Sequence, residues 1–91
     1  MLDISYSVKF KRDIKLMKKQ GRNMKLLRDV VDILAAEKSL DPKYRDHPLT
    51  DYTGQRECHI QSDWLLIYKV EKKELRLTLT RTGSHSILFR E

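Results

Sequence analysis

The most apolar segment of the chain, from Trp64 to Val70, restricts the fold more than any other feature. Its length and its aromatic and branched side chains favour a central strand of a sheet. Residues 56–60 precede it as a second candidate strand, with a tight turn expected at Gln61 and Ser62. After a turn at residues 71–73, three leucines alternate with polar residues through Leu79. That alternation predicts a third strand with one buried face and one solvent-exposed face.

Two helices are predicted before this strand region. Residues 2–6 alternate apolar and polar side chains like a half-buried strand, and Ser7 can cap a helix that follows. Gly21 is placed to end that helix, and Asn23 to cap a second one that extends to about Glu37. The apolar stripe of the first helix is formed by Phe10, Ile14 and Met17, and that of the second by Met24, Leu27, Val31 and Leu34, widened by Leu26, Val30 and Ile33. A stripe this broad predicts that the second helix packs deeply against a sheet.

The segment from Ser39 to Gln55 contains both prolines and Gly54, and it reads as a long ordered loop. A long loop in a small domain is often functional. The expected order is therefore β-α-α-β-β-β with a short C-terminal helix or turn. This order predicts a single α+β domain over residues 1–91, with a mainly antiparallel sheet packed against the two N-terminal helices.

Positive charge is concentrated in the first third of the chain. Residues 1–28 contain nine basic and two acidic side chains, whereas the rest of the chain contains ten basic and eleven acidic ones. A positive field on one side of a protein attracts polyanions such as RNA. Two other interpretations remain open, namely a solvated lysine-rich helix and a binding surface for an acidic protein.

Several protein classes do not fit this sequence. No segment approaches the roughly 18 consecutive apolar residues of a membrane-spanning helix, and the first residues do not resemble a signal peptide. The single cysteine, Cys58, cannot form an internal disulfide, and strand alternation places it in the core beside Ile60. We therefore expect a cytoplasmic protein that does not interact with membranes.

The candidate catalytic residues lie in the second half of the chain. They are three histidines, His47, His59 and His85, together with Asp63. RNA can be cleaved without a metal when a general base takes the 2′-hydroxyl proton and a general acid protonates the leaving 5′-oxygen. Histidine suits both roles near neutral pH. Arginine pairs with phosphate through two hydrogen bonds, and an aromatic ring stacks on an unpaired base. The arginine candidates are Arg56 and Arg81, and the aromatic candidates are Trp64, Tyr52 and Phe89.

Other interpretations of the same residues have to be kept. A zinc site is disfavoured because His47, His59 and Cys58 lack the close paired spacing of structural zinc ligands. Trp64 and Phe89 fit a core as well as an RNA contact. A turn at Gln61–Ser62 would place His59 opposite Trp64, and a longer turn would change that pairing. The residues alone therefore indicate a basic α+β domain that binds RNA or cleaves it.

Four strings carry a resemblance to a known family. Asp46-His47-Pro48-Leu49, Arg56 to Ile60, Asp63 to Tyr68 and Arg81 to Phe89 follow one another in the order and spacing of YafQ-type toxins. The resemblance covers nearly the whole chain. It implies a RelE-like fold and the toxin of a type II toxin–antitoxin pair, which cleaves mRNA in the ribosomal A site without a cofactor.

The resemblance also implies which residues act. The activity residues of the family correspond to His47, His59, Asp63, Trp64, His85 and Phe89, and the phosphate-binding candidates are Arg56 and Arg81. We expect His85 to be the general acid. We expect the general base to be His47 rather than Asp63 acting with His59. Trp64 and Phe89 would orient the bases of the RNA or shape the pocket.

The resemblance implies several partners. The toxin would bind the 70S ribosome through its basic first helix. The residues involved would be Lys9, Lys11, Arg12, Lys15, Lys18 and Lys19. A cognate antitoxin would supply an acidic toxin-binding segment and a DNA-binding domain, and operator DNA would be bound only through that complex. Two alternatives differ in kind, namely a ParE-like toxin that inhibits DNA gyrase and a non-catalytic RNA-binding module. A pure inhibitor needs neither an acid nor a base, so the histidine set favours the ribonuclease.

Overall fold

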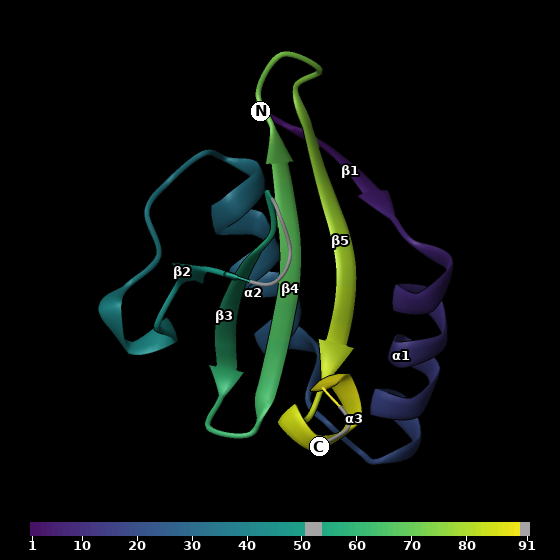
Figure 1. Ribbon diagram of the computed structural model, residues 1–91. Helices are drawn as coiled ribbons and strands as arrows, with labels where there is room; N and C mark the ends of the chain where they lie inside the picture. Colours follow the sequence, from purple (N-terminus) through teal and green to yellow (C-terminus); the bar gives the residue numbers. More distant parts are fainter. Residues whose placement is uncertain (51–53, 90–91) are drawn as a thin grey trace.

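The computed structural model describes residues 1–50 and 54–89, in which five strands form one sheet (Figure 1). The strand order across the sheet is β1-β5-β4-β3-β2. Strand β1 pairs in parallel with β5, and the other neighbouring strands are antiparallel. The strands are β1 (Asp3–Tyr6), β2 (His47–Pro48), β3 (Arg56–Gln61), β4 (Trp64–Glu71) and β5 (Arg76–Gly83).

The helices begin and end at the residues that local chemistry predicts. Helix α1 (Val8–Lys19) is capped by Ser7, whose hydroxyl accepts a hydrogen bond from the Phe10 amide. Helix α2 (Met24–Ala35) is capped by Asn23 through the Lys25 amide. Gly21, with φ +73°, separates the two helices in the left-handed conformation that glycine adopts without strain. The short helices are η1 (Pro42–Tyr44), of the 3-10 type, and α3 (His85–Phe89).

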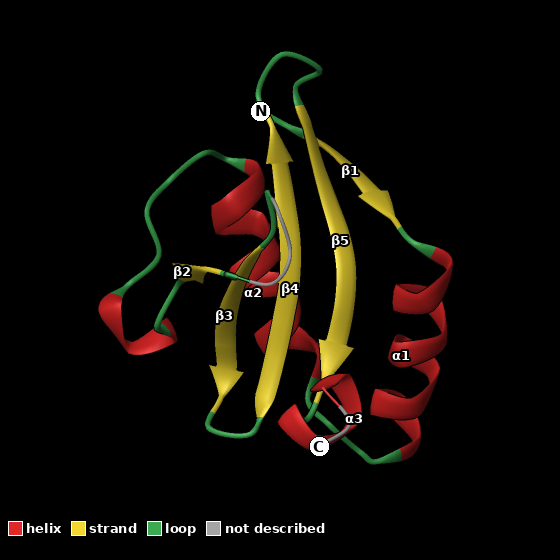
Figure 2. Ribbon diagram, viewed as in Figure 1, coloured by secondary structure: helices red, strands yellow, loops and turns green. Residues whose placement is uncertain are grey.

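One face of the sheet is covered by the two long helices. Figure 2 shows α2 behind β3 and β4, and α1 beside β5. Both helices contribute to one apolar core, in which Met17, Val30 and Leu66 are fully buried. The strands reach this core through alternate residues, namely Cys58 and Ile60 from β3, Trp64, Leu66 and Tyr68 from β4, and Leu77 and Leu79 from β5. Burial of this apolar surface is the main force that holds the sheet and helices together. None of the described helices is long and apolar enough to cross a membrane.

Two local predictions were wrong. The segment predicted as a long ordered loop without regular secondary structure contains η1 and β2, and β2 pairs with β3 through His47–Glu57 and Pro48–Arg56. A two-residue strand leaves no periodic pattern in the sequence, and proline is tolerated because β2 is an edge strand. The β3–β4 turn consists of Ser62 and Asp63, so that Gln61 pairs with Trp64. An irregularity between His59 and Gln61 then sets His59 opposite Leu65.

Candidate active site

The second face of the sheet collects most of the candidate catalytic residues. Because side chains alternate along a strand, Glu57 and His59 point away from the face that holds Cys58 and Ile60. On β4, Leu65 and Ile67 point the same way as Glu57 and His59, and they form a small second core with Leu88 of α3. We call this surface the open face. It lacks the cover that α1 and α2 give the other side.

A carboxylate lies between two histidines on the open face. The Nε2 atom of His47 is 3.4 Å from Glu57 Oε1, and the Nε2 atom of His59 is 3.6 Å from the same oxygen. The Glu57 residue is 6% exposed, whereas the imidazole of His47 is half-exposed. A buried carboxylate requires charged or hydrogen-bonding partners, and here the two imidazoles provide them. Glu57 can therefore stabilise a proton on either ring.

The two imidazoles differ in their other contacts. His47 Nδ1 lies 3.1 Å from the backbone carbonyl of Pro48. Both nitrogens of His47 thus lie near oxygen atoms. His59 Nε2 faces Glu57 at 3.6 Å. The two rings therefore share one carboxylate, and His47 also approaches a backbone carbonyl.

His85 and Asp63 meet at the end of the sheet, where α3 begins. A carboxylate oxygen of Asp63 accepts a hydrogen bond of 3.3 Å from the backbone amide of His85. The His85 ring contacts the Phe89 ring, with 4.8 Å between the centroids. Phe89 in turn packs against the small core of Leu65 and Ile67. Asp63 and Phe89 thus hold the short helix that carries His85.

The sheet register relates His59 to His85. His59 pairs with Leu65, and Leu65 pairs with Gly83 on its other side. Neighbouring strands are about 4.8 Å apart, so the backbones of His59 and Gly83 are separated by about 10 Å. His85 follows Gly83 by two residues. His59 of β3 and the start of α3, which carries His85, therefore lie on either side of Leu65 of β4.

Arg81 links the open face to the basic helix. Its guanidinium donates to the Asp13 carboxylate at 2.7 and 3.1 Å, and Asp13 also accepts from the Thr82 amide. Arg81, Lys9 and Arg12 line one hollow of about 430 Å³ between α1, β5 and α3. The six basic residues that were expected to bind ribosomal RNA are all exposed. The positive surface of α1 therefore continues to the edge of the candidate site.

Arg56 does not join these residues, contrary to the expectation that it lies in the site. Its guanidinium pairs with Asp46 at 3.3 Å, on the face opposite His59. Asp46 also accepts a hydrogen bond from the Tyr68 hydroxyl at 2.5 Å. Burial, together with the Asp46 carboxylate, raises the pKa of Tyr68 well above its usual range, and the same carboxylate raises the pKa of Arg56. This cluster, Asp46, Arg56 and Tyr68, anchors the residue that precedes His47.

Trp64 is also not placed to contact RNA. It is fully buried in the core under the helices, and its indole N–H donates to the Thr82 hydroxyl at 2.8 Å. The Thr82 hydroxyl donates in turn to the Leu65 carbonyl at 2.7 Å. The expectation that Trp64 stacks on a base does not fit this burial, because strand alternation turns the ring inward. Tyr52, the other aromatic candidate, lies outside the described residues.

The prediction that Cys58 packs in the core is confirmed. The residue is fully buried, and burial raises the pKa of its thiol to about 12. A thiol in that state supplies almost no thiolate at neutral pH, and the thiolate is the reactive form.

The sequence interpretation missed two carboxylates. Glu57 lies within the string from Arg56 to Ile60, and its spacing of two from His59 on a strand puts both on one face. Alternation could therefore have identified it. Asp13, the partner of Arg81, gave a weaker signal, namely an acidic residue within a strongly basic helix.

Three side chains could hold a transition-metal ion. His47, Glu57 and His59 each offer a ligand atom, and these atoms lie within 4.8 Å of one another. Imidazole and carboxylate ligands suit zinc and copper. From the sequence, zinc was considered at His47, His59 and Cys58 and disfavoured. In the structure Cys58 is buried in the core, and Glu57 forms the set of three with the two histidines.

Comparisons with known proteins agree with this fold. The family model described as "Bacterial toxin of type II toxin-antitoxin system, YafQ" matches residues 2–90. The mRNA interferase toxin YafQ of Escherichia coli strain B / BL21-DE3 is 40% identical over 89 residues, which cover 96% of this chain and 95% of the relative.

Solved structures are similar over the whole described fold. The metal-bound toxin from Helicobacter pylori is 50% identical, with a TM-score of 0.93 over 98% of this chain and 100% of that chain. The YafQ chain of the E. coli DinJ–YafQ complex is 38% identical, with a TM-score of 0.90 over 98% and 99% of the two chains. The α+β fold that the resemblance implied is confirmed.

Proposed function

Because the chain belongs to the YafQ family of bacterial type II toxins, and is an mRNA interferase toxin of such a system, we propose that it cleaves mRNA in the ribosomal A site by metal-independent acid–base chemistry. The observation that supports this mechanism is the placement of His59, backed by Glu57, and His85 on the open face. Two imidazoles on either side of a bound phosphate are the groups that 2′-hydroxyl attack requires.

The proposed reaction uses one imidazole for each proton. His59 Nδ1 takes the proton of the 2′-hydroxyl, and Glu57 stabilises the imidazolium that forms. The 2′-oxygen then bonds to phosphorus while the bond to the 5′-oxygen breaks. Protonated His85 gives its proton to that leaving oxygen. The products are a 2′,3′-cyclic phosphate and a free 5′-hydroxyl.

Other residues hold the substrate or the catalytic groups. Protonated His47 and Arg81 would face the phosphate, whose negative charge grows during the attack. Asp63 positions His85 through the backbone amide and takes no proton in this scheme. This assignment moves the general base from His47, which the sequence favoured, to His59. Tight contact of both His47 nitrogens with acceptors is the reason for the change.

The first experiment uses purified protein, its His85→Ala variant and ribosomes programmed with a defined mRNA. We expect cuts within the A-site codon, 3′ ends with cyclic phosphate, and a loss of about 100- to 10,000-fold in the variant. A 2′-deoxy substitution at the cut nucleotide should abolish cleavage, since it removes the nucleophile. Intact mRNA would contradict the nuclease assignment, and equal cleavage without ribosomes would remove the ribosome requirement.

The basic face of α1 is proposed to bind ribosomal RNA. The lysines of this face are exposed and contact phosphate without reading base sequence. Changing Lys11, Lys15 and Lys18 to Gln should weaken ribosome binding and flatten its dependence on salt. An unchanged salt slope would contradict this role. We also propose that a cognate antitoxin with an acidic segment inhibits the toxin, as the DinJ–YafQ complex pairs the E. coli relative with a partner.

A metal ion is proposed as an inhibitor of this site. A metal-bound relative from H. pylori is known, and His47, Glu57 and His59 form a suitable ligand set in this chain. An ion bound there would occupy the nitrogens that must exchange protons. We expect added Zn²⁺ to slow cleavage and EDTA to leave the metal-free rate unchanged. Loss of activity in EDTA that Zn²⁺ restores would contradict the proposed chemistry.

A further inference from the structure

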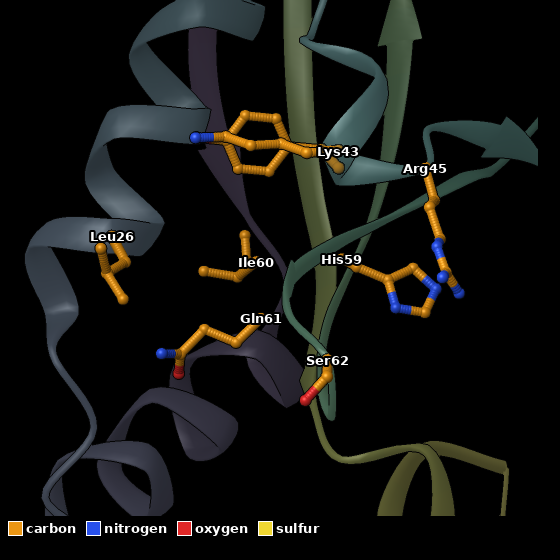
Figure 3. Close-up of a pocket in the computed structure, with 8 residues that line it drawn as sticks. Leu26, Lys43, Arg45, His59, Ile60, Gln61 and Ser62 are labelled. Carbon is orange, nitrogen blue, oxygen red and sulfur yellow. The ribbon is translucent and has the colours of Figure 1, made fainter.

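We propose that the hollow beside His59 binds the base of the nucleotide that carries the attacking 2′-hydroxyl, and that it sets the base preference of cleavage. This inference rests on the proposed function. The hollow has a volume of about 480 Å³, and its lining comes from η1, β3, the β3–β4 turn and α2 (Figure 3). A volume of this size is within the usual range for sites that bind small ligands.

His59 connects the hollow to the catalytic groups. It lines the hollow, and its Nε2 atom lies 3.6 Å from Glu57. If His59 takes the 2′-hydroxyl proton, the ribose of that nucleotide must lie within hydrogen-bond reach of its imidazole. The base attached to this ribose then extends from His59, and the hollow is the adjoining space large enough to hold it.

The floor of the hollow can contact a flat aromatic base. Leu26 of α2 and Ile60 of β3 supply apolar surface, and Tyr44 of η1 supplies an aromatic ring. Lys43 Nζ lies 5.1 Å from the centre of that ring, so a cation already covers part of the tyrosine. Unpaired bases in RNA-binding proteins rest on surfaces of this kind.

Polar groups at one side of the hollow are available to read the base edge. The side chains of Gln61 and Ser62 are exposed and, within residues 1–50 and 54–89, make no hydrogen bond. A glutamine amide offers one donor group and one acceptor, which can pair with two atoms of a base. Strand β2 pairs only with Arg56 and Glu57, so in the described chain the outer edge of β3 beyond Glu57 also has no strand partner.

Two cations are among the residues that line the hollow. Lys43 and Arg45 are both exposed, and Figure 3 shows the Arg45 guanidinium extending toward the imidazole of His59. Arg45 adopts φ +49° at the end of η1, and its amide donates to the Pro42 carbonyl at 3.0 Å. Arg45 and His59 thus line the same hollow, and the guanidinium could pair with a phosphate next to the bound nucleotide.

The binding experiment uses four uncleavable RNA trinucleotides that contain a 2′-deoxy residue at the cut position and differ only in that base. NMR shifts of labelled protein should change at His59, Ile60, Gln61 and Ser62, and the four ligands should differ in affinity. Gln61→Ala should weaken the preferred ligand by about 10-fold and reduce the differences among the four. Arg45→Gln should weaken all four similarly. The matched controls are Gln20→Ala and Arg76→Gln, exposed residues outside the hollow.

The cleavage experiment compares the same variants on programmed ribosomes. We expect Gln61→Ala to flatten base preference at the cut nucleotide while it still cleaves its best substrate. Shifts confined to the α1 surface, or Gln61→Ala cleavage with unchanged preference, would overturn the inference. If Gln61→Ala weakened ribosome binding equally for every mRNA, the hollow would instead belong to ribosomal RNA, and the inference would also be overturned. The trinucleotide experiment does not depend on catalysis, so it distinguishes failure of the inference from failure of the proposed nuclease.

Discussion

The two faces of the sheet are built from the same strands but are covered differently. The face under α1 and α2 is a continuous apolar core, where Trp64, Leu66 and Tyr68 of β4 are almost fully buried. The open face has a smaller core of Leu65, Ile67 and Leu88, surrounded by polar and charged side chains. On β3 the two environments alternate from one residue to the next, with Cys58 inside and His59 outside.

This difference separates stability from chemistry. Substitutions on the helix-covered face should change the free energy of unfolding, whereas substitutions on the open face should change the rate of cleavage. Glu57 is the most informative exception, because it is buried and charged yet belongs to the open face. Buried ionic groups at functional sites often cost stability, and their replacement can leave the fold as stable or make it more so.

Among the substitutions that test this division, the largest effect is expected for Glu57→Gln, which keeps the shape of the side chain and removes its charge. Without the carboxylate the imidazolium of His59 loses its stabilising partner, and we expect cleavage to slow by about 100-fold. The free energy of unfolding should change by less than about 1 kcal/mol, because the amide oxygen can still accept a hydrogen bond from either imidazole. Single-turnover cleavage and urea denaturation measure the two quantities, with Glu71→Gln on β4 as the control. A destabilised but active variant would break the division between the faces.

Trp64→Phe tests the other side of the division. The change removes part of a fully buried ring and the hydrogen bond to Thr82, so we expect a loss of about 2 kcal/mol in the free energy of unfolding. Cleavage by the folded variant should be close to normal. Denaturation and cleavage at low temperature provide the measurements. Normal stability with a raised KM would mean that the ring touches RNA.

A smaller effect is expected for Tyr68→Phe. Its hydroxyl reaches Asp46, the residue before His47, so the change should cost about 1 kcal/mol and slow cleavage a few-fold by loosening His47. NMR signals of the His47 imidazole should shift while those of His85 remain. Tyr6→Phe is the control, since Tyr6 is half-exposed on β1 at the opposite edge of the sheet. Unchanged His47 signals would show that the cluster of Asp46, Arg56 and Tyr68 has no effect on the open face.

The smallest effect concerns alkaline pH. The thiol of Cys58 has a pKa of about 12 in the folded chain, against the ordinary value of 9.0, so above pH 9 the unfolded chain releases this proton first. The contribution of this thiol to the free energy of unfolding is therefore fully present below pH 9. It falls as the pH rises, by about 0.8 kcal/mol at pH 9.5. Tyr68, with an ordinary value of 10.0 and a raised pKa, adds to the fall at higher pH. Denaturation of Cys58→Ala should show a shallower decline, and parallel curves would contradict the assignment.

Local features of the fold could be predicted from the sequence because short-range chemistry determines them. Ser7 and Asn23 cap helices through amides two or three residues away, and Gly21 needs only its own freedom at positive φ. Alternation also placed Cys58 in the core correctly. Each of these depends on neighbours along the chain, so no knowledge of the tertiary structure was needed.

The composition of the site was less predictable because it depends on register. The irregularity between His59 and Gln61, and a turn one residue later than predicted, decide which side chains share the open face. Strand β2 exists only through its pairing with β3, and that pairing brings His47 beside Glu57. Arg56 and Trp64 were assigned to the site by resemblance, but strand parity puts both side chains on the opposite face. Asp13 and Arg81 meet across 68 positions of sequence, a distance at which periodicity says nothing.

The parallel pairing of β1 with β5 determines how late in its synthesis the enzyme can complete its fold. Asp3 pairs with Arg76, and the Ser7 amide donates to the Leu79 carbonyl. At the usual rate of translation, roughly 4–15 s pass between the synthesis of β1 and the synthesis of β5. During that interval the first strand has no partner, and β4 and β5, which carry much of the open face, are still being made. A ribosome that makes this toxin therefore finishes nearly all of the sheet before the product can attack a message.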